Sequence, residues 1–402
     1  MDQKVNLGFS APDKAEAKAV ATWQGFGEHG MRTHTTHDEG AQLNFMMTMF
    51  RHLGANVAPG RRAVYDTRIK PKFVREHNRE PKDRHEVRKA VLDDPYFQMW
   101  GHLRLYCQRK SYDIRRELVD RQLDELIERA KPRKGDIGTL DLDPDFEIPK
   151  YQAAFDMHWM PGSFYTEFAK DDVAAGAMYD TGGLYLALSG HLGEHNDGAG
   201  YAVVSYLRDK YPDFKPKDVL DQGCTAGAGT LPFKDAWPDA QVHAIDIGAP
   251  VLRYAHRRAE SLGYAIHFAQ QNAEHTKYED ESFDFVVSTM FLHETSNKAV
   301  HNIVKEAHRL LRPGGLMLHV EQPPFSWHDD PFEQFVRDWD THNNNEPFWG
   351  PMHDMDPEEV ALKAGFARED IVQEMVPLIS PTKTDKYAKG QGAWFVFAAW
   401  KK

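Results

Sequence analysis

The spacing of hydrophobic and polar positions changes near residue 217. From there on, short apolar runs alternate with longer stretches in which apolar residues recur every three or four positions. The runs of strand length are "DVLDQG", "AQVHAID", "AIHFAQQ", "FDFVVSTM" and "LMLHVEQ". Between them lie helical patterns such as "APVLRYAHRRAESLG", which ends at Gly263, and "HNIVKEAHRLLRPGG". Strands that alternate with helices predict βαβ units and a mostly parallel sheet.

Two further strand patterns close the chain. "EDIVQEMVPL" and "GAWFVFAAW" follow a helical pattern over "DPEEVALKAGF", and no helix separates them. A pair without a crossover helix is expected to be antiparallel. The chain from 217 onward therefore predicts an α/β fold with a seven-stranded, mostly parallel sheet and helices on both faces.

The first 150 residues show no such alternation. "YDIRRELVDRQLDELIERA" at 112–130 places apolar residues on one face of a predicted helix. The Pro-, Gly- and Asp-rich stretch that follows, "KPRKGDIGTLDLDPDFEIP", is typical of a linker. We therefore expect a mainly helical N-terminal domain over 1–150 and a second domain over 151–402, with an aromatic-rich insertion at 323–356.

Composition narrows the function classes. The 41% hydrophobic and 12% aromatic content is that of a globular protein, and the net charge of −12 argues against general binding to nucleic acid or anionic membrane. Residues 61–134 nevertheless hold 21 Lys and Arg against 13 Asp and Glu. This basic segment is either a mixed helical surface or a phosphate-binding face. Two cysteines, no signal-peptide pattern and no membrane-length apolar run predict a cytoplasmic protein.

The stretch "VLDQGCTAGAGT", Val219–Thr230, is a strand that runs into a glycine-rich turn. Such a turn lets the backbone approach a ligand closely at the carboxyl end of a strand. Asp246 ends the next strand, 25 residues after Asp221, where an acid can accept hydrogen bonds from a ribose diol. The pattern G-x-G-x-x-G cannot be written over this turn, which counts against an NAD or FAD site.

Four blocks carry a resemblance: "VLDQGCTAGAGT", "VHAIDIGAPVLRYA", "NAEHTKYEDESFDFVVSTMFLHE" and "EAHRLLRPGGLMLHVEQ". In this order and spacing they resemble the class I S-adenosylmethionine-dependent methyltransferases, and among them the small-molecule branch that includes the ubiquinone/menaquinone-biosynthesis type. The resemblance covers roughly 217–321. It implies a Rossmann-like fold and S-adenosyl-L-methionine as the cofactor.

The resemblance also implies which residues contact the cofactor: Asp221, Gly223, Cys224, Thr225 and Gly227 in the turn, Asp246 and Ile247 after the second strand, Asn272 and Ala273 after the third, and Ser288 at the end of the fourth. Asn272 stands where the family usually has an aspartate. Thr225 stands where the familiar turn has a glycine, and we expect it to adopt a negative φ and turn its hydroxyl toward the cofactor. Two plainer roles remain open: Asp221 could order the turn, and Asp246 could cap a helix.

Methyl transfer to a hydroxyl needs a group that removes a proton near the ends of the fourth and fifth strands. "FLHETSN" places His293 and Glu294 there, and a histidine titrates near neutrality. We predict them as the catalytic pair, although His293 could instead only hold the loop in place. Because Glu294 is the one acid in this loop and no metal-binding His or Cys motif occurs, we expect no metal.

Substrate selection is expected outside the sheet. The insertion at 323–356 is long for a connection, and its aromatic residues could line an apolar pocket. We single out Trp327, His328 and Trp349 there. The stretch "HWMPGSFYTEF" could close the pocket from the other side, with Tyr165 near the cofactor. Alternatively, the aromatic residues hold the insertion or a dimer interface in place.

Three functions agree with these patterns. The first is methylation of a small aromatic or otherwise apolar metabolite, on O or else on C or N, with the N-terminal domain covering the site or forming a homodimer. The second is methylation of RNA or a protein that docks on the basic segment 61–134, although the net charge makes nucleic acid the less favoured partner. The third is a non-catalytic protein that binds the cofactor.

Overall fold

The computed structural model describes residues 21–181, 187, 188 and 190–402; residues 1–20, on which the signal-peptide prediction falls, lie outside this part. One eight-stranded sheet forms the centre, in the order β1-β4-β3-β2-β5-β6-β8-β7. Its strands are β1 (Thr139–Asp141), β2 (Asp218–Gln222), β3 (Gln241–Asp246), β4 (His267–Gln270), β5 (Phe283–Thr289), β6 (Leu311–Glu321), β7 (Ile371–Ile379) and β8 (Lys389–Trp400).

Strands β1 to β6 are parallel, whereas β8 is antiparallel to both β6 and β7. This confirms the α/β class and the antiparallel terminal pair. The sheet has one strand more than expected, because β1 comes from the stretch that the sequence predicts to be a linker. Its residue Thr139 pairs with His267 of β4, and the carboxylate of Glu260 accepts the N–H groups of Ile137 and Gly138 just before it. Three residues without an apolar pattern could not be recognised as an edge strand.

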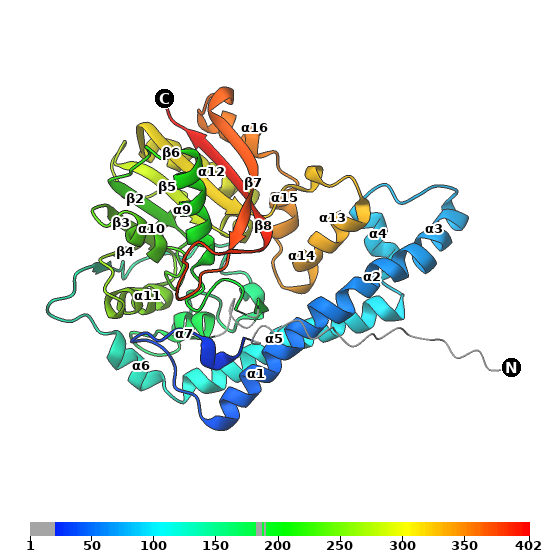
Figure 1. The fold of residues 1–402 in the computed structure, drawn as a ribbon, viewed down its shortest axis with the longest axis horizontal. Coiled ribbons are helices and arrows are strands. Elements are labelled where there is room, and N and C mark those ends of the chain that lie inside the picture. Colours follow the sequence, from blue (N-terminus) through cyan, green and yellow to red (C-terminus); the bar gives the residue numbers. More distant parts are fainter. Residues whose placement is uncertain (1–20, 182–186, 189) are drawn as a thin grey trace.

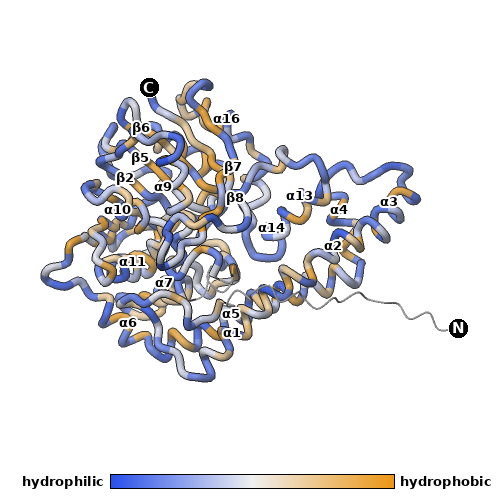
Figure 2. Tube along the Cα trace, in the orientation of Figure 1, coloured by the Kyte–Doolittle hydropathy of each residue, from blue (hydrophilic) through white to orange (hydrophobic). Residues whose placement is uncertain are grey.

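Helices cover both faces of the sheet (Figure 1). Neighbouring residues of β2 show why: Val219 packs into the core on one face and Leu220 into the core on the other. The first core is covered by α9 (Gly198–Lys210), α10 (Leu231–Ala236) and α11 (Ala249–Ser261), and the second by α12 (Asn297–Leu310) and α16 (Pro357–Ala364). In Figure 2 orange, hydrophobic stretches accordingly lie within the sheet, with blue, hydrophilic segments around it.

The N-terminal region is helical, and its helices over residues 37–120 form an arm that extends away from the sheet (Figure 1). Its elements are η1 (Trp23–Gly25), α1 (His37–His52), η2 (Leu53–Val57), α2 (Ala58–Val64), η3 (Tyr65–Ile69), α3 (Lys70–His77), α4 (Arg84–Val91), α5 (Pro95–Asp120) and α6 (Leu123–Ala130). The helix expected over 112–130 is therefore two helices. They separate at Gln122, whose side chain accepts the N–H of His34 and donates to the carbonyl of Leu118.

The chain between the arm and the sheet contains η4 (Met157–Trp159) and α7 (Ala174–Asp180). Beyond it, the turn η5 (Leu292–Glu294) follows β5, and η7 (Arg368–Asp370) precedes β7. The insertion contains η6 (Phe325–Trp327), α13 (Pro331–Arg337), α14 (Trp339–Asn343) and α15 (Trp349–His353). It lies between the sheet and the end of the arm (Figure 1). No helix in the described part of the chain has the length and apolar character needed to cross a membrane.

Candidate functional site

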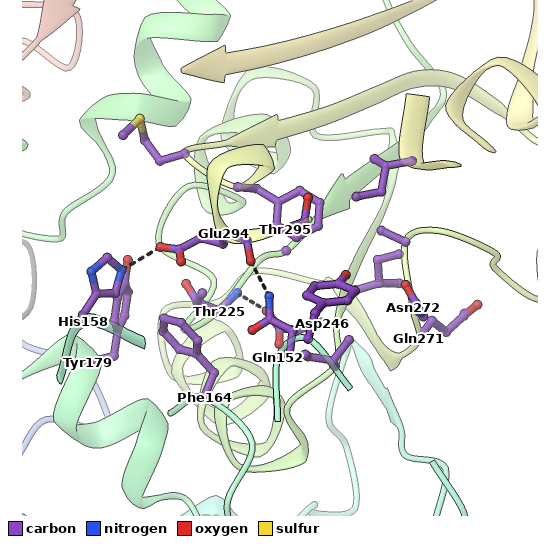
Figure 3. Close-up of a pocket in the computed structure, with 18 residues that line it drawn as sticks. Gln152, His158, Phe164, Tyr179, Thr225, Asp246, Gln271, Asn272, Glu294 and Thr295 are labelled. Carbon is purple, nitrogen blue, oxygen red and sulfur yellow. Dashed lines mark hydrogen bonds and ion pairs between the residues drawn. The ribbon is translucent and has the colours of Figure 1, made fainter. Parts of the chain in front are cut away.

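A cavity of about 700 Å³ lies at the carboxyl ends of the central parallel strands. This is where open α/β sheets bind ligands. Seven residues singled out from the sequence line it: Gly223, Thr225, Asp246, Ile247, Asn272, Ala273 and Glu294. Figure 3 shows Asn272 at one end of the cavity and Glu294 at the other, with Asp246 between them. The fold thus brings residues from four loops into one space.

The glycine turn after β2 is tightly folded. Gly223 and Cys224 both donate their N–H to the carbonyl of Ile245, and Gly227 donates to the carbonyl of Cys224. Gly223 has a φ of +71°, and a Cβ added there would lie 2.2 Å from the ring of Phe291. A side chain at Gly223 would therefore clash, which explains the glycine by geometry alone.

Thr225 departs from the expectation of a negative φ, because its φ is +45°. The reason is the hydrogen bond that its N–H donates to Oδ2 of Asp246 at 3.0 Å. That bond requires the backbone to turn with left-handed geometry between Gly223 and Gly227, which have φ values of +71° and +74°. A β-branched residue pays a steric cost in this conformation.

Asp246 ends β3, is 6% exposed and borders the cavity. Its two oxygens accept the N–H groups of Thr225 and, at 2.9 Å, of Gly248. Burial raises the pKa of this carboxyl to about 6, despite these hydrogen bonds. Each oxygen keeps a second lone pair, so the carboxylate can still accept hydrogen bonds from a ligand.

Asn272 and Ala273 form the wall after β4. The side-chain carbonyl of Asn272 accepts the N–H of Glu274 at 2.9 Å, which fixes the side chain at the rim. Ala273 is 5% exposed and, together with Ile247, gives this end of the cavity an apolar surface. The combination of a flat apolar wall and an amide at its edge suits a heteroaromatic base.

Four of the predicted cofactor residues lie behind the cavity wall. Asp221 is 2% exposed and accepts the hydroxyl of Thr230 at 2.5 Å, and burial raises its pKa to about 7. Cys224 and Gly227 pack beneath the turn, and burial raises the pKa of the Cys224 thiol. Ser288 is fully buried and bonds Nδ1 of His319 at 2.7 Å. These residues support the turn and the strand from below.

The predicted catalytic pair is split by the structure. Glu294 borders the cavity, whereas His293 is 3% exposed and lies behind it. Nδ1 of His293 is 2.6 Å from Glu321 Oε2, and its Nε2 is 3.5 Å from Glu294 Oε1. The two carboxylates raise the pKa of His293 well above its usual range against the opposing effect of burial. The histidine therefore holds Glu294 and Glu321 together as a cation.

The opposite wall of the cavity comes from the segment between β1 and β2. Tyr151, Gln152, His158, Phe164 and Tyr179 line it, and Figure 3 shows His158 and Tyr179 beside Glu294. One signal for this wall was visible in the sequence, since His158 and Phe164 belong to the stretch expected to close the pocket. The other three residues carried no motif. Their part in the site depends on contacts with residues more than 40 positions away.

The four predicted substrate residues do not line the cavity. Trp327 is 45% exposed and contacts Phe395, whereas Trp349 packs against His293 with ring centres 4.7 Å apart. His328 and Tyr165 also lie outside the lining. Other aromatic residues of the insertion bind it to the arm, as the pair of Phe332 with Tyr65 and of Trp339 with Trp100 shows.

Comparison with known proteins agrees with this site. Residues 219–315 match the model of a methyltransferase domain, which confirms over this segment the resemblance to class I methyltransferases. A demethylmenaquinone methyltransferase of Thermus thermophilus is 30% identical over 109 residues, which are 27% of this chain and 49% of that protein. A malonyl-[acyl-carrier protein] O-methyltransferase of Dechloromonas aromatica is 29% identical over 166 residues, 41% of this chain and 57% of that protein. The chain thus spans about half the length of these relatives.

Among solved structures, a SAM-dependent methyltransferase of Methanosarcina mazei is 24% identical, with a TM-score of 0.34 over 46% of this chain and 92% of that one. At this level of superposition the likeness adds nothing to the match of residues 219–315.

The residues of the cavity fit S-adenosylmethionine. Asp246 offers a buried carboxylate with free lone pairs for two hydroxyls, and Asn272 edges an apolar wall that suits a purine. Gly223 borders the same cavity, and the space that its side chain would take is filled by the ring of Phe291. The methyltransferase domain and this donor set together support S-adenosylmethionine as the cofactor.

Proposed function

We propose that the protein is an S-adenosylmethionine-dependent methyltransferase whose acceptor is a small, largely apolar molecule. The observation that carries the proposal is the convergence of Gly223, Asp246 and Asn272 on one cavity within the segment that matches a methyltransferase domain. The printed names of the relatives, which include quinone and acyl-carrier methyltransferases, support a small or carrier-bound acceptor.

In this proposal the chain binds the cofactor along the cavity. Asp246 accepts hydrogen bonds from the ribose, Asn272 and Ala273 contact the base, and Gly223 and Thr225 face the amino-acid end. When bound, S-adenosylmethionine supplies a methyl group on a sulfonium. The residues that remain at the far end, among them Phe164, exclude water from the transfer.

Glu294 places negative charge at the end of the cavity opposite Asn272. We propose that this charge holds the acceptor group that receives the methyl, and that His293 positions Glu294 from behind. A hydroxyl acceptor is favoured because a carboxylate accepts the hydrogen bond of an O–H and receives its proton when the oxygen takes the methyl group. O-methylation is therefore the first reaction to assay.

Isothermal titration calorimetry with S-adenosylhomocysteine tests the cofactor part. We expect one site per chain, and at least about 10-fold weaker binding in Asp246→Ala, because the loss of a charge-assisted hydrogen bond costs this much. Asp239→Ala, in the turn just before the same strand and exposed, is the matched control. Absence of binding by the folded wild-type protein would refute the proposal. Transfer of labelled methyl to a panel of phenols and hydroxy acids then tests the acceptor class.

A further inference from the structure

Three ligand-type side chains meet at the end of the cavity where Glu294 lies. His158 comes from η4, Glu294 from η5 and Glu346 from the segment between α14 and α15. Nε2 of His158 is 2.7 Å from Glu294 Oε1, and its Nδ1 is 2.8 Å from Glu346 Oε1. One ligand atom from each residue lies within 4.8 Å of the others. Three distant parts of the chain thus converge on one small volume.

Two oxygens of this cluster have no partner. Oε2 of Glu294 and Oε2 of Glu346 are shielded from solvent, and neither has a hydrogen-bond partner in the part of the chain that the structure describes. The Glu346 side chain is only 2% exposed. A buried carboxylate oxygen without a donor or a cation is costly. Both oxygens therefore indicate a cation that the protein itself does not supply.

The surroundings carry more negative than positive charge. Asp340 is half-buried near Glu346, and desolvation together with the charge of Glu346 raises its pKa to about 6. A fourth carboxylate, Glu321, is already bound by His293. His158, even as an imidazolium, and His293, whose Nε2 is 3.5 Å from Glu294 Oε1, leave Oε2 of Glu294 and of Glu346 without a partner among the described residues.

We propose that His158, Glu294 and Glu346 bind one divalent transition-metal ion at this end of the cavity. One imidazole nitrogen and two carboxylates suit Mn²⁺ or Zn²⁺ better than Mg²⁺ or Ca²⁺, which prefer oxygen ligands alone. Ligand bonds of about 2.0–2.2 Å place two ligands of one ion at most about 4.4 Å apart. Binding therefore needs the His158 ring to turn one nitrogen toward both carboxylates, and the carboxylates to close by a few tenths of an ångström.

A bare ion-pair cluster is the competing explanation. It accounts for the two short contacts of His158, but it leaves Oε2 of Glu294 and Oε2 of Glu346 without partners. A metal ion uses these oxygens as well. A role of the ion in catalysis rests on the proposed function. In that role an open position of the ion would bind an oxygen of the acceptor and lower the pKa of that oxygen beside the methyl donor. The binding of the ion does not depend on methyl transfer.

Metal binding to chelator-treated, full-length protein tests the site. We expect Mn²⁺, followed by electron paramagnetic resonance of the free ion, and Zn²⁺, followed by calorimetry, to bind at one site per chain. Mg²⁺ should bind at least about 10-fold more weakly. Glu346→Gln and His158→Asn should each weaken Mn²⁺ binding by about 10-fold or more. His342→Ala, on the same insertion, and Glu279→Gln, an exposed carboxylate, should bind as the wild type does.

The melting temperature supplies a second readout. Mn²⁺ should raise it in the wild type and in both controls, but not in Glu346→Gln or His158→Asn, whose folding is checked by circular dichroism without metal. No stoichiometric binding by the wild type, or equal binding by these two variants, would overturn the metal site. S-adenosylhomocysteine binding is measured separately on the same samples, so that failure of the metal site and failure of the cofactor site are distinguished.

Discussion

Asp246 combines a ligand role with an unusual environment. Its oxygens accept the N–H groups of Thr225 and Gly248, and its charge helps to raise the pKa of the buried Asp221. Since burial raises the pKa of Asp246 to about 6, the carboxylate gains a proton as the pH falls through this value. A protonated acid is a poorer acceptor for ribose hydroxyls. The affinity for the cofactor should therefore fall as the pH drops below about 6.

We expect the affinity for S-adenosylhomocysteine to be constant from pH 7 to 7.5 and to fall by about 10-fold between pH 7 and pH 5, the slope of one linked proton. Calorimetry across this range measures it. In Asp246→Asn the affinity should be low at every pH and nearly flat. A wild-type profile without a fall below pH 6 would show that this carboxylate does not titrate against the ligand.

Thr225 stores backbone strain in the cofactor turn. Its φ of +45° is costly for a β-branched residue, and glycine would adopt it freely. Thr225→Gly should relieve about 1–2 kcal/mol of strain, offset by about 0.4–1 kcal/mol of unfolded-chain entropy. The free energy of unfolding in urea should therefore rise by up to about 1 kcal/mol, with a modest change in cofactor affinity.

Thr225→Ala is the control for this variant, because it removes the hydroxyl and keeps a Cβ at positive φ. It should gain little stability. A clear loss of stability in Thr225→Gly would mean that contacts of the threonine side chain outweigh the strain. The sequence showed that the residue at this position is unusual for the turn, but it did not reveal the backbone conformation. That conformation goes with the hydrogen bond from the N–H of Thr225 to Asp246, which is 21 positions away.

At the scale of elements, predictability follows the local pattern. Strands β2 to β6 were predictable because each is a short, mostly buried run with an apolar centre that is set between helical patterns, as Phe283–Thr289 shows. The cofactor residues Asp246 and Asn272 could be predicted because they stand at or just after the ends of those strands. Strand β1 and the wall that contains Tyr151 and His158 were not predictable, because pairing with β4 and the contact with Glu294 are set by tertiary packing.

Arg84 of α4 joins the arm to the insertion. Its Nε is 3.0 Å from Asp338 Oδ2, its Nη2 is 2.6 Å from Asp354 Oδ2, and its guanidinium lies 4.3 Å from the ring centre of Phe325. Asp338 is 4% exposed, so Arg84→Met would leave a buried carboxylate without its cation. We expect the free energy of unfolding to fall by about 3 kcal/mol.

Urea unfolding and limited proteolysis of the insertion measure this effect. The matched control is Arg79→Met, which breaks the exposed ion pair with Glu86 just before the same helix and should change little. If Arg84→Met unfolds as the wild type does, the arm and the insertion are held together by their other contacts, which are aromatic pairs and the ion pair of Arg62 with Asp330. Such a result would assign their attachment to pairs such as Trp100 with Trp339.

At the scale of the whole molecule, the basic segment 61–134 decides between a small acceptor and an RNA. Many of its arginines already bind acids of the protein: Arg62 with Asp66 and Asp330, Arg68 with Asp94, Arg79 with Glu86, Arg84 with Asp338 and Asp354, Arg116 with Asp120, and Arg121 with Glu39. A guanidinium that is paired in this way releases no counterion from a phosphate backbone. The segment therefore offers far less charge to RNA than its composition suggests.

With a net charge of −12 for the chain, we expect a mixed-sequence 20-nucleotide RNA to bind more weakly than about 100 μM at 150 mM salt, the weak end of non-specific affinity. Fluorescence anisotropy between 20 and 200 mM salt measures it, with S-adenosylhomocysteine binding as the check that the protein is folded. A low-micromolar affinity with a log–log salt slope steeper than about −3 would require four or more phosphate contacts. Such contacts would come from the Lys and Arg residues of the basic segment, and the small-molecule proposal would then give way to an RNA substrate.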